Sequence, residues 1–267
     1  MSSFDRNAAA VDYGRPLTRA EAAVVDAGLR AYMLRIYNYM VLGLAITGLA
    51  ALGAYMLSVT GDPASAVRGA AALRNGVYLT PIGYALFVSP LKWLIILAPL
   101  AIVFFLGFRI ETMRPSTAQI TFWIYAALVG VSLGVLFLVY THTSIVRVFF
   151  ITAAAFGALS LWGYTTQRDL TGMGSFLVMG LFGIIIASLV NIFLASSALQ
   201  WTISVIGVLI FAGLTAWDTQ RLKSEYIYGS MEGDVLERSA IMGALSLYLD
   251  FLNLFTFLLQ ILGNREE

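Results

Sequence analysis

The sequence contains no cysteine and a single histidine, and only 12% of its 267 residues are charged. The absence of cysteine excludes disulfide bonds, thiol catalysis and zinc–thiolate sites. Lys and Arg number 16 against 15 Asp and Glu, with no basic patch, so we expect no nucleic-acid partner. Soluble domains carry about 25% charged residues, roughly twice the share found here. Hydrophobic residues make up 60% of the chain, which is typical of a polytopic helical membrane protein.

Long stretches without any charged residue recur along the chain, and the longest covers residues 170–217. A membrane-spanning helix needs about 20 mostly apolar residues. The sequence therefore predicts an all-α fold, a bundle of seven transmembrane helices. The expected spans are residues 36–58, 91–110, 119–140, 145–165, 174–195, 199–219 and 241–263. A β-barrel is excluded because its strands would alternate polar and apolar residues.

These spans divide the chain into a tail (1–35), a membrane domain (36–263) and a short C-terminal tail (264–267). The membrane domain contains a long loop at 59–90 and a further loop at 220–240. If the N-terminus is cytoplasmic, eleven of the 16 Lys and Arg lie on the cytoplasmic side. The five on the other side are Arg68, Arg74, Lys92, Arg147 and Arg265. Because positive charge favours the cytoplasmic side, we expect a cytoplasmic N-terminus and an outside C-terminus.

Asp250 lies inside the last predicted span, where a charge is costly and needs a reason. It belongs to a largely polar stripe whose members recur every three or four residues, as on one face of a helix. The stripe comprises Ser239, Gly243, Ser246, Asp250, Asn253, Phe257 and Gln260. If the stripe served only for packing between helices, that would explain its serine and glycine residues. An ionisable residue is less easily explained by packing, so Asp250 favours a functional role for the stripe. We expect Ser246, Asn253 and Gly243 to line a pathway beside Asp250.

Asp218 and Arg109 end the sixth and second predicted spans, and both fall on the cytoplasmic side in the expected topology. Each has a structural alternative: Asp218 can pair with Arg221 three residues later, and Arg109 can be an interfacial anchor. Asn191 lies within the fifth span, where it either bonds to another helix or lines the pathway. The depths of Asp218 and Asp250 agree only if the last helix is tilted or begins late.

Two carboxylates brought together in a low-dielectric bundle titrate as one coupled unit. At low pH a shared proton bridges them and holds the sixth and seventh spans together, whereas at higher pH both ionise and repel. Carboxylates are also hard oxygen ligands that suit Ca²⁺. Two are too few for a tight cage, so Asp218 and Asp250 would form only a weak, transient Ca²⁺ site.

Several segments together resemble the Bax inhibitor family, also called the transmembrane Bax-inhibitor-motif family. The most specific is ALSLYLDFLNLF at 244–255, which contains Asp250. Supporting segments are WDTQ at 217–220, IIASLVNIF at 185–193 and FFLGFR at 104–109. The resemblance covers residues 30–263, and the alanine-rich, cysteine-free sequence suggests a bacterial member from an inner membrane.

This resemblance implies a seven-helix fold with the last helix central and surrounded by the other six. It implies a pH-dependent calcium leak, with Ca²⁺ as the permeating ion and no cofactor. It also implies that Asp218 and Asp250 share a proton as pH sensor and gate, and that Arg109 is a latch partner near Asp218. The expected partners are the lipid bilayer, Ca²⁺ and H⁺.

Three other classes of function compete with this interpretation. A membrane-embedded interaction protein would modulate a membrane protease or a stress pathway through a membrane-protein partner. A proton-coupled transporter would accumulate its substrate against a gradient. An intramembrane aspartyl protease would also use two aspartates, but its second motif, Gly-x-Gly-Asp, is absent around Asp250. We therefore expect no enzymatic activity.

Overall fold

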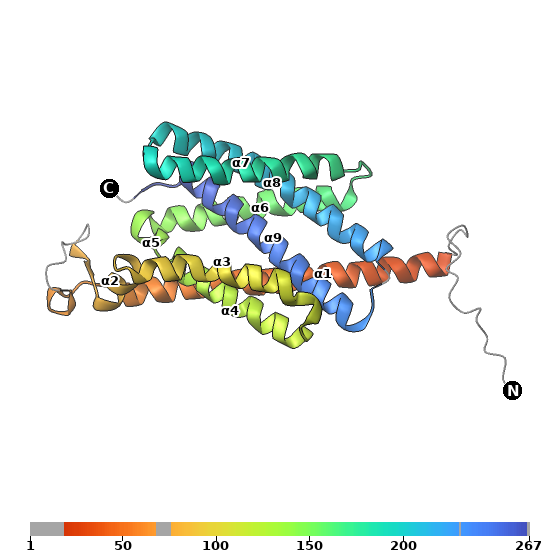
Figure 1. Cartoon of the computed structure of the whole chain (residues 1–267), viewed down its shortest axis with the longest axis horizontal. Coiled ribbons are helices and arrows are strands. Elements are labelled where there is room, and N and C mark those ends of the chain that lie inside the picture. The colour runs from red at the N-terminus through yellow and green to blue at the C-terminus, as the bar shows by residue number, and fades with distance from the viewer. Residues whose placement is uncertain (1–18, 68–75, 230, 266–267) are drawn as a thin grey trace.

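The structure is a computed structural model that describes residues 19–67, 76–229 and 231–265 (Figure 1). It confirms the all-α prediction, since seven described helices are long and apolar enough to cross a membrane. These are α1 (Arg19–Ser58), α3 (Leu91–Arg109), α4 (Pro115–Leu133), α6 (His142–Thr165), α7 (Thr171–Leu194), α8 (Ser197–Tyr228) and α9 (Gly233–Leu262). The short helices are α2 (Pro81–Phe87), α5 (Leu136–Val139) and two 3₁₀ turns, η1 (Pro63–Ser65) and η3 (Ile110–Thr112).

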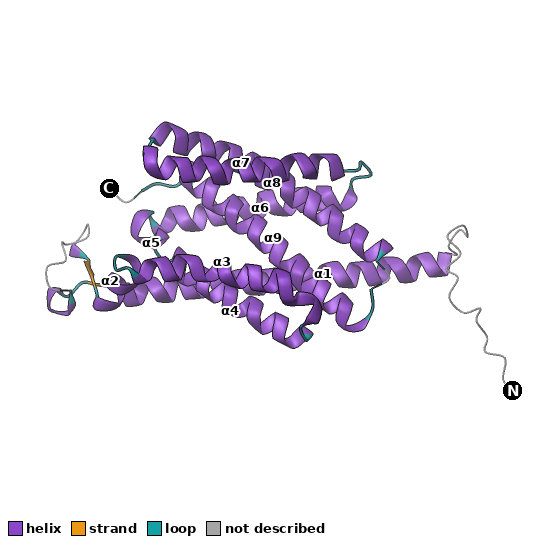
Figure 2. Ribbon diagram, viewed as in Figure 1, coloured by secondary structure: helices purple, strands orange, loops and turns teal. Residues whose placement is uncertain are grey.

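The segment between α1 and α3 carries the small amount of strand found in the described residues (Figure 2). Strands β1 (Val59–Thr60) and β2 (Tyr78–Leu79) pair antiparallel. Thr80 then caps α2, because its hydroxyl accepts a hydrogen bond from the N–H of Gly83 at 3.1 Å. The long loop predicted at 59–90 thus contains a hairpin and a short helix.

Three helices extend well beyond the apolar runs that predicted them. Helix α1 begins at Arg19 instead of residue 36, and most of the loop predicted at 220–240 is helical, since α8 ends at Tyr228 and α9 begins at Gly233. The extensions pack against one another: the rings of Tyr32 and Tyr226 stack at 5.2 Å, and the Tyr32 hydroxyl bonds to Ser239 at 2.8 Å. Tertiary packing stabilises helix here, in segments that are more polar than the apolar runs beside them.

Helix α9 occupies the centre of the bundle and runs obliquely through it (Figure 1). Its main neighbours are α1, α4, α6 and α8, whereas α3 packs on α4, and α7 packs on α8. In the apolar segment of α9, 44% of the residues are buried, against 17% in the corresponding segments of α3 and α7. The last helix is therefore central, as predicted, but α3 and α7 form an outer layer and do not surround it directly.

A close crossing of α1, α4 and α9 fixes this arrangement. A Cβ on Gly130 of α4 would lie 2.4 Å from the backbone oxygen of Thr47, so only glycine permits this approach. The Thr47 hydroxyl bonds in turn to the hydroxyl of Tyr248 on α9 at 2.6 Å. Tyr248 is fully buried, and the rings of Phe122 and Tyr125 meet it edge-on. The central helix is thus held by both shape and hydrogen bonding.

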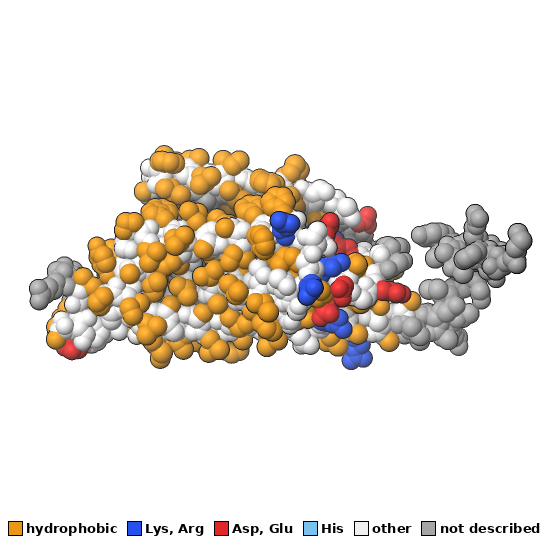
Figure 3. All heavy atoms as spheres, turned by 60° about the horizontal axis from the view of Figure 1, so that its bottom comes forward, with side chains coloured by type: hydrophobic (Ala, Val, Ile, Leu, Met, Phe, Trp, Pro, Cys, Tyr) orange, Lys and Arg blue, Asp and Glu red, His pale blue; other side chains and the backbone are white. Residues whose placement is uncertain are grey.

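The outer surface is largely apolar along the bundle, as expected for contact with lipid acyl chains. In Figure 3 most charged side chains gather at the end where α1 begins, and the rest of that face is hydrophobic. Helix α1 begins at one end of the bundle and α9 ends at the other (Figure 1). At that far end the chain is fastened by a hydrogen bond from the N–H of Asn264 to the Ser144 hydroxyl at 2.8 Å.

Candidate functional site

The structure brings the two predicted aspartates together between α8 and α9. The carboxyl groups of Asp218 and Asp250 lie within hydrogen-bonding reach of each other. Both are buried, with 7% of Asp218 and 4% of Asp250 exposed. Whether these residues meet was left open by the sequence, and the structure answers it.

The contact depends on the oblique path of α9. Asp218 lies about 15 Å along α8 from its end at Tyr228, and Asp250 lies about 25 Å along α9 from its start at Gly233, at 1.5 Å per residue. Two parallel helices would place these residues at different depths. Helix α9 runs obliquely (Figure 1), and the two carboxyl groups meet in spite of this difference, so the tilt compensates for it.

Among the described residues Arg221 is the cation beside the pair, and of the two aspartates it forms an ion pair with Asp218. The guanidinium of Arg221 lies 3.0 Å from Asp218 Oδ1 and donates to the Ser246 hydroxyl at 3.3 Å. It also approaches Glu225 at 3.5 Å and lies over the Trp217 ring at 5.0 Å. The contact with Asp218 is electrostatic, because Oδ1 has no well-aligned hydrogen-bond donor among the described residues.

Asp250 has a buried oxygen, Oδ2, with no hydrogen-bond partner in the described part of the chain. A buried acceptor without a partner is costly, and two ionised carboxylates in direct contact would repel strongly. The arrangement is therefore chemically consistent when one proton is shared between Asp218 and Asp250. Loss of that proton would leave two negative charges facing one arginine.

Arg109 does not join this cluster. Its side chain is exposed at the end of α3, which packs on α4 and α2. Within the described residues it has no ion pair, and the position expected for it beside Asp218 belongs to Arg221. The structure does not bring Arg109 and Asp218 together, and the latch role implied for Arg109 by the family resemblance stays a prediction. Arg221 reaches Asp218 because residues three apart lie on the same face of a helix.

The polar stripe of α9 faces α8 along most of its length. Gly243 permits a close approach, since a Cβ there would lie 2.7 Å from the Leu222 side chain. Ser246 receives the hydrogen bond from Arg221. Asn253 donates to the carbonyl of Leu249 in its own helix at 2.8 Å. The three residues predicted beside Asp250 thus have different roles: packing for Gly243, contact with the charged cluster for Ser246, and a bond within α9 for Asn253.

Asn191 lies far from the aspartates, at the opposite end of the α8–α9 seam. Its amide donates to Gln200 at 3.1 Å and accepts from the N–H of Ser196 at 3.1 Å, which braces the turn between α7 and α8. Gln200 and Ser204 both donate to Gln260 at 2.7 Å. Of the two interpretations of Asn191, the structure shows the bond to another helix. It lies beside a cavity of about 430 Å³.

An apolar stretch separates this outer amide cluster from the aspartates. The Phe211 and Phe257 rings lie 5.9 Å apart, and Leu254 is buried beside them on α9. The seam between α8 and α9 therefore runs from the aspartates, through an apolar middle, to an end rich in amides, where Arg265 also lines the cavity. Such an order suits a pathway that is closed by apolar side chains and entered from polar ends.

Sequence reasoning missed a row of hydroxyl groups beside the site. The Ser160 hydroxyl on α6 bonds to both Tyr37 of α1 and Thr219 of α8, the residue after Asp218. Gln220 fixes the loop before α7, accepting from the N–H of Leu170 at 2.8 Å. The sequence offered one signal for these contacts: the four consecutive residues WDTQ at 217–220 are polar or amphipathic, although the helix around them is apolar. In the structure Thr219 and Gln220 bond to different neighbours.

Comparison with known proteins agrees with this architecture. Residues 29–267 match the family described as "Inhibitor of apoptosis-promoting Bax1". The chain belongs to the Bax inhibitor family. It is 46% identical to the protein RP147 of Rickettsia prowazekii over 260 residues, which cover 96% of this chain and all of RP147. It is 44% identical to a Caulobacter vibrioides protein over 271 residues, which cover both chains entirely.

A third relative bears on the location. The Escherichia coli protein named "Inner membrane protein YbhL" is 43% identical over 242 residues, which cover 90% of this chain and 94% of YbhL. Together with the seven apolar helices, this similarity identifies the chain as an integral membrane protein of the Bax inhibitor family.

Proposed function

We propose that this protein is a pH-sensitive calcium leak in a bacterial inner membrane, with the Asp218–Asp250 pair as its pH sensor and gate. The observation that carries the proposal is the buried contact between these two carboxyl groups, which come from different helices. A proton shared between them joins α8 to α9, and its loss turns that attraction into repulsion.

The charges of the described helix ends support an orientation with α1 beginning in the cytoplasm. Besides Arg19, at which α1 begins, that end carries eight basic residues: Arg30, Arg35, Arg109, Arg114, Arg168, Arg221, Lys223 and Arg238. The opposite end carries three: Lys92, Arg147 and Arg265. Under the positive-inside rule the aspartates face the cytoplasmic half of the bundle, and the C-terminus lies outside. Cytoplasmic pH would then set the protonation of the pair.

Ca²⁺ is the proposed permeating ion because carboxylate oxygens are its preferred ligands. Among the described residues no group of three or more His, Cys, Asp or Glu could hold a metal ion. Two carboxylates provide a weak site that an ion can enter and leave, which conduction requires.

Calcium flux into dye-loaded liposomes tests the proposal directly. We expect the purified protein to admit Ca²⁺, with faster entry at about pH 8 than at about pH 6, because the shared proton is lost as the pH rises. Protein-free liposomes at each pH provide the baseline. Absence of flux at both pH values would contradict the leak and favour the membrane-embedded interaction protein. Accumulation of Ca²⁺ against its gradient would instead indicate a proton-coupled transporter.

The arginine beside the pair gives a second test. Arg221 favours loss of the shared proton, so Arg221→Gln should move the midpoint of the flux–pH curve upward by about one pH unit. Arg109→Gln is the matched control, because it removes the same charge from the exposed end of α3. A shift with Arg109→Gln and none with Arg221→Gln would show that Arg109 is the latch in the conducting protein.

A further inference from the structure

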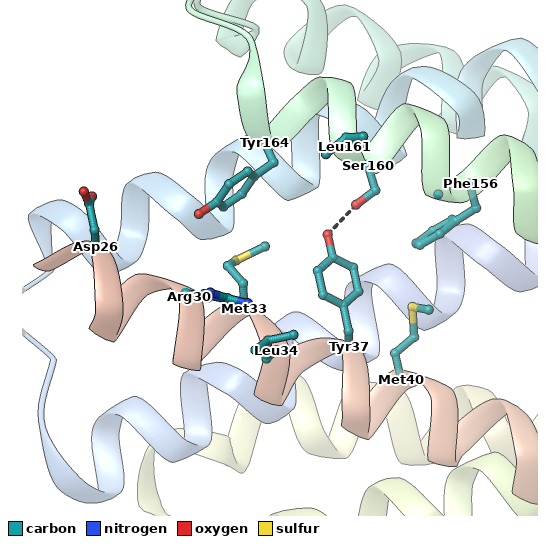
Figure 4. A pocket seen from close by; sticks show the side chains of 11 residues that line it. Asp26, Arg30, Met33, Leu34, Tyr37, Met40, Phe156, Ser160, Leu161 and Tyr164 are labelled. Atoms are coloured by element: carbon teal, nitrogen blue, oxygen red, sulfur yellow. Dashed lines mark hydrogen bonds between the residues drawn. The ribbon is translucent and has the colours of Figure 1, made fainter. Parts of the chain in front are cut away.

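A groove on the lipid-facing side separates α1 from α6 (Figure 4). It contains a cavity of about 780 Å³ near the end where α1 begins, and Leu34 and Leu161 at its rim are 52% and 64% exposed. A second cavity of about 720 Å³ continues it along the same two helices, and the two share Met40 and Phe156. In a bilayer such a groove is filled by acyl chains or by another apolar segment.

The end of the groove changes from apolar to charged in a definite order. Tyr37 and Tyr164 point into it from opposite walls, and the Tyr37 hydroxyl bonds to Ser160 across the floor (Figure 4). Beyond these hydroxyls α1 presents Arg30 and then, one turn further out, Asp26. Within the described ranges neither charge has an ion-pair partner.

A second basic residue lies near the same end. Lys223 of α8 donates to the carbonyl of Tyr164 at 3.0 Å, and its ammonium group lies 5.2 Å from the centre of the Tyr164 ring. From the bundle centre outward, the groove thus offers apolar walls, then hydroxyls, then positive charge, then one negative charge.

We propose that this groove binds a glycerophospholipid whose headgroup carries an ammonium group. Its acyl chain lies between Met40 and Phe156, its phosphate meets Arg30, and its ammonium group meets Asp26. Arg30 and Asp26 are separated by about 6 Å along the helix, a spacing that suits adjacent phosphate and ammonium groups. The opposite order of charges would not fit, because the phosphate lies nearer the acyl chains. This inference does not depend on the calcium leak.

Lipid binding to the detergent-purified full chain, measured by native mass spectrometry, tests the headgroup assignment. The probes are phosphatidylethanolamine, which has the ammonium group, and phosphatidylglycerol, which lacks it. We expect the wild type to prefer phosphatidylethanolamine, and Asp26→Asn to abolish that preference. Arg30→Gln should weaken binding of both lipids about tenfold, the loss of one charge-assisted hydrogen bond. Arg35→Gln, an exposed arginine of α1 that does not line the groove, is the control.

Filling the groove provides an independent test. Gly157 lines it, and a Cβ there would meet nothing within 4 Å, so Gly157→Leu should leave the fold intact and displace the acyl chain. Gly183→Leu on exposed α7 is equally uncrowded and lies outside the groove. We expect fewer bound lipids for Gly157→Leu and an unchanged number for Gly183→Leu. Equal binding of both probes by the wild type, or equal loss with Arg30→Gln and Arg35→Gln, would overturn the proposal. So would a protein helix bound in the groove in place of lipid.

Discussion

Replacing Asp250 with asparagine should remove the pH dependence of calcium entry, so that flux at about pH 6 and at about pH 8 agrees within about twofold. Asparagine keeps the shape of the side chain and stays neutral at every pH. It can still donate a hydrogen bond to Asp218, as the shared proton does in the wild type. The α8–α9 contact would then no longer break when the solution becomes more alkaline. Dye-loaded liposomes with matched amounts of reconstituted protein provide the measurement.

The control for this variant is an aspartate outside the membrane spans. Asp169 is exposed, and hydrogen bonds from the side chain and the backbone N–H of Thr171 lower the pKa of its carboxyl group. Asp169 is therefore already ionised across the assay range, and the amide oxygen of asparagine can still accept the hydrogen bond from the N–H of Thr171. Asp169→Asn should keep the full pH dependence. If Asp250→Asn and Asp218→Asn each keep it too, this pair is not the sensor.

The position of the buried charge at Asp250 could be predicted because charged residues are costly and therefore rare inside membrane-spanning helices. Asp250 interrupts an apolar run, and the stripe through it has helical spacing, so its inward orientation followed from the sequence. The spacing within α9 did not show which helix Asp250 faces, because a pattern within one helix carries no information about the neighbouring helix. The contact with Asp218 depends on the tilt of α9, which is held by contacts with other helices such as that of Tyr248 with Thr47 of α1.

Helices α1, α8 and α9 are longer than the predicted spans for one physical reason. Hydropathy reports where a chain is apolar, so it placed the start of α1 at residue 36 and counted the polar ends of α8 and α9 as loop. Packing between those ends, such as that of Tyr32 with Tyr226, extends the helices beyond the apolar runs. The pair of Asp218 with Arg221 followed from their spacing of three residues, whereas the role of Arg109 came from the family resemblance and stays a prediction.

A second substitution with a large expected effect lies where α6 crosses α8, close to Asp218. A Cβ on Gly163 of α6 would lie 2.2 Å from the carbonyl oxygen of Ala216 and 2.9 Å from its Cα. These are backbone atoms of α8, which cannot turn aside as a flexible side chain would. Gly163→Val should therefore force α8 away from α6 and lower the free energy of unfolding by about 3 kcal/mol. Thermal unfolding in detergent provides the measurement.

Gly183→Val is the matched control, since a Cβ at that position of α7 meets no atom within 4 Å. It should unfold at the wild-type temperature or slightly above, because valine has a higher helix propensity than glycine. If Gly163→Val does not fold, Gly163→Ala still places a Cβ against α8 and should show a smaller loss. Ala216 lies two residues before Asp218, so any folded variant at Gly163 should also shift the pH midpoint of calcium flux. Wild-type stability and an unshifted midpoint together would mean that α6 does not set the position of Asp218.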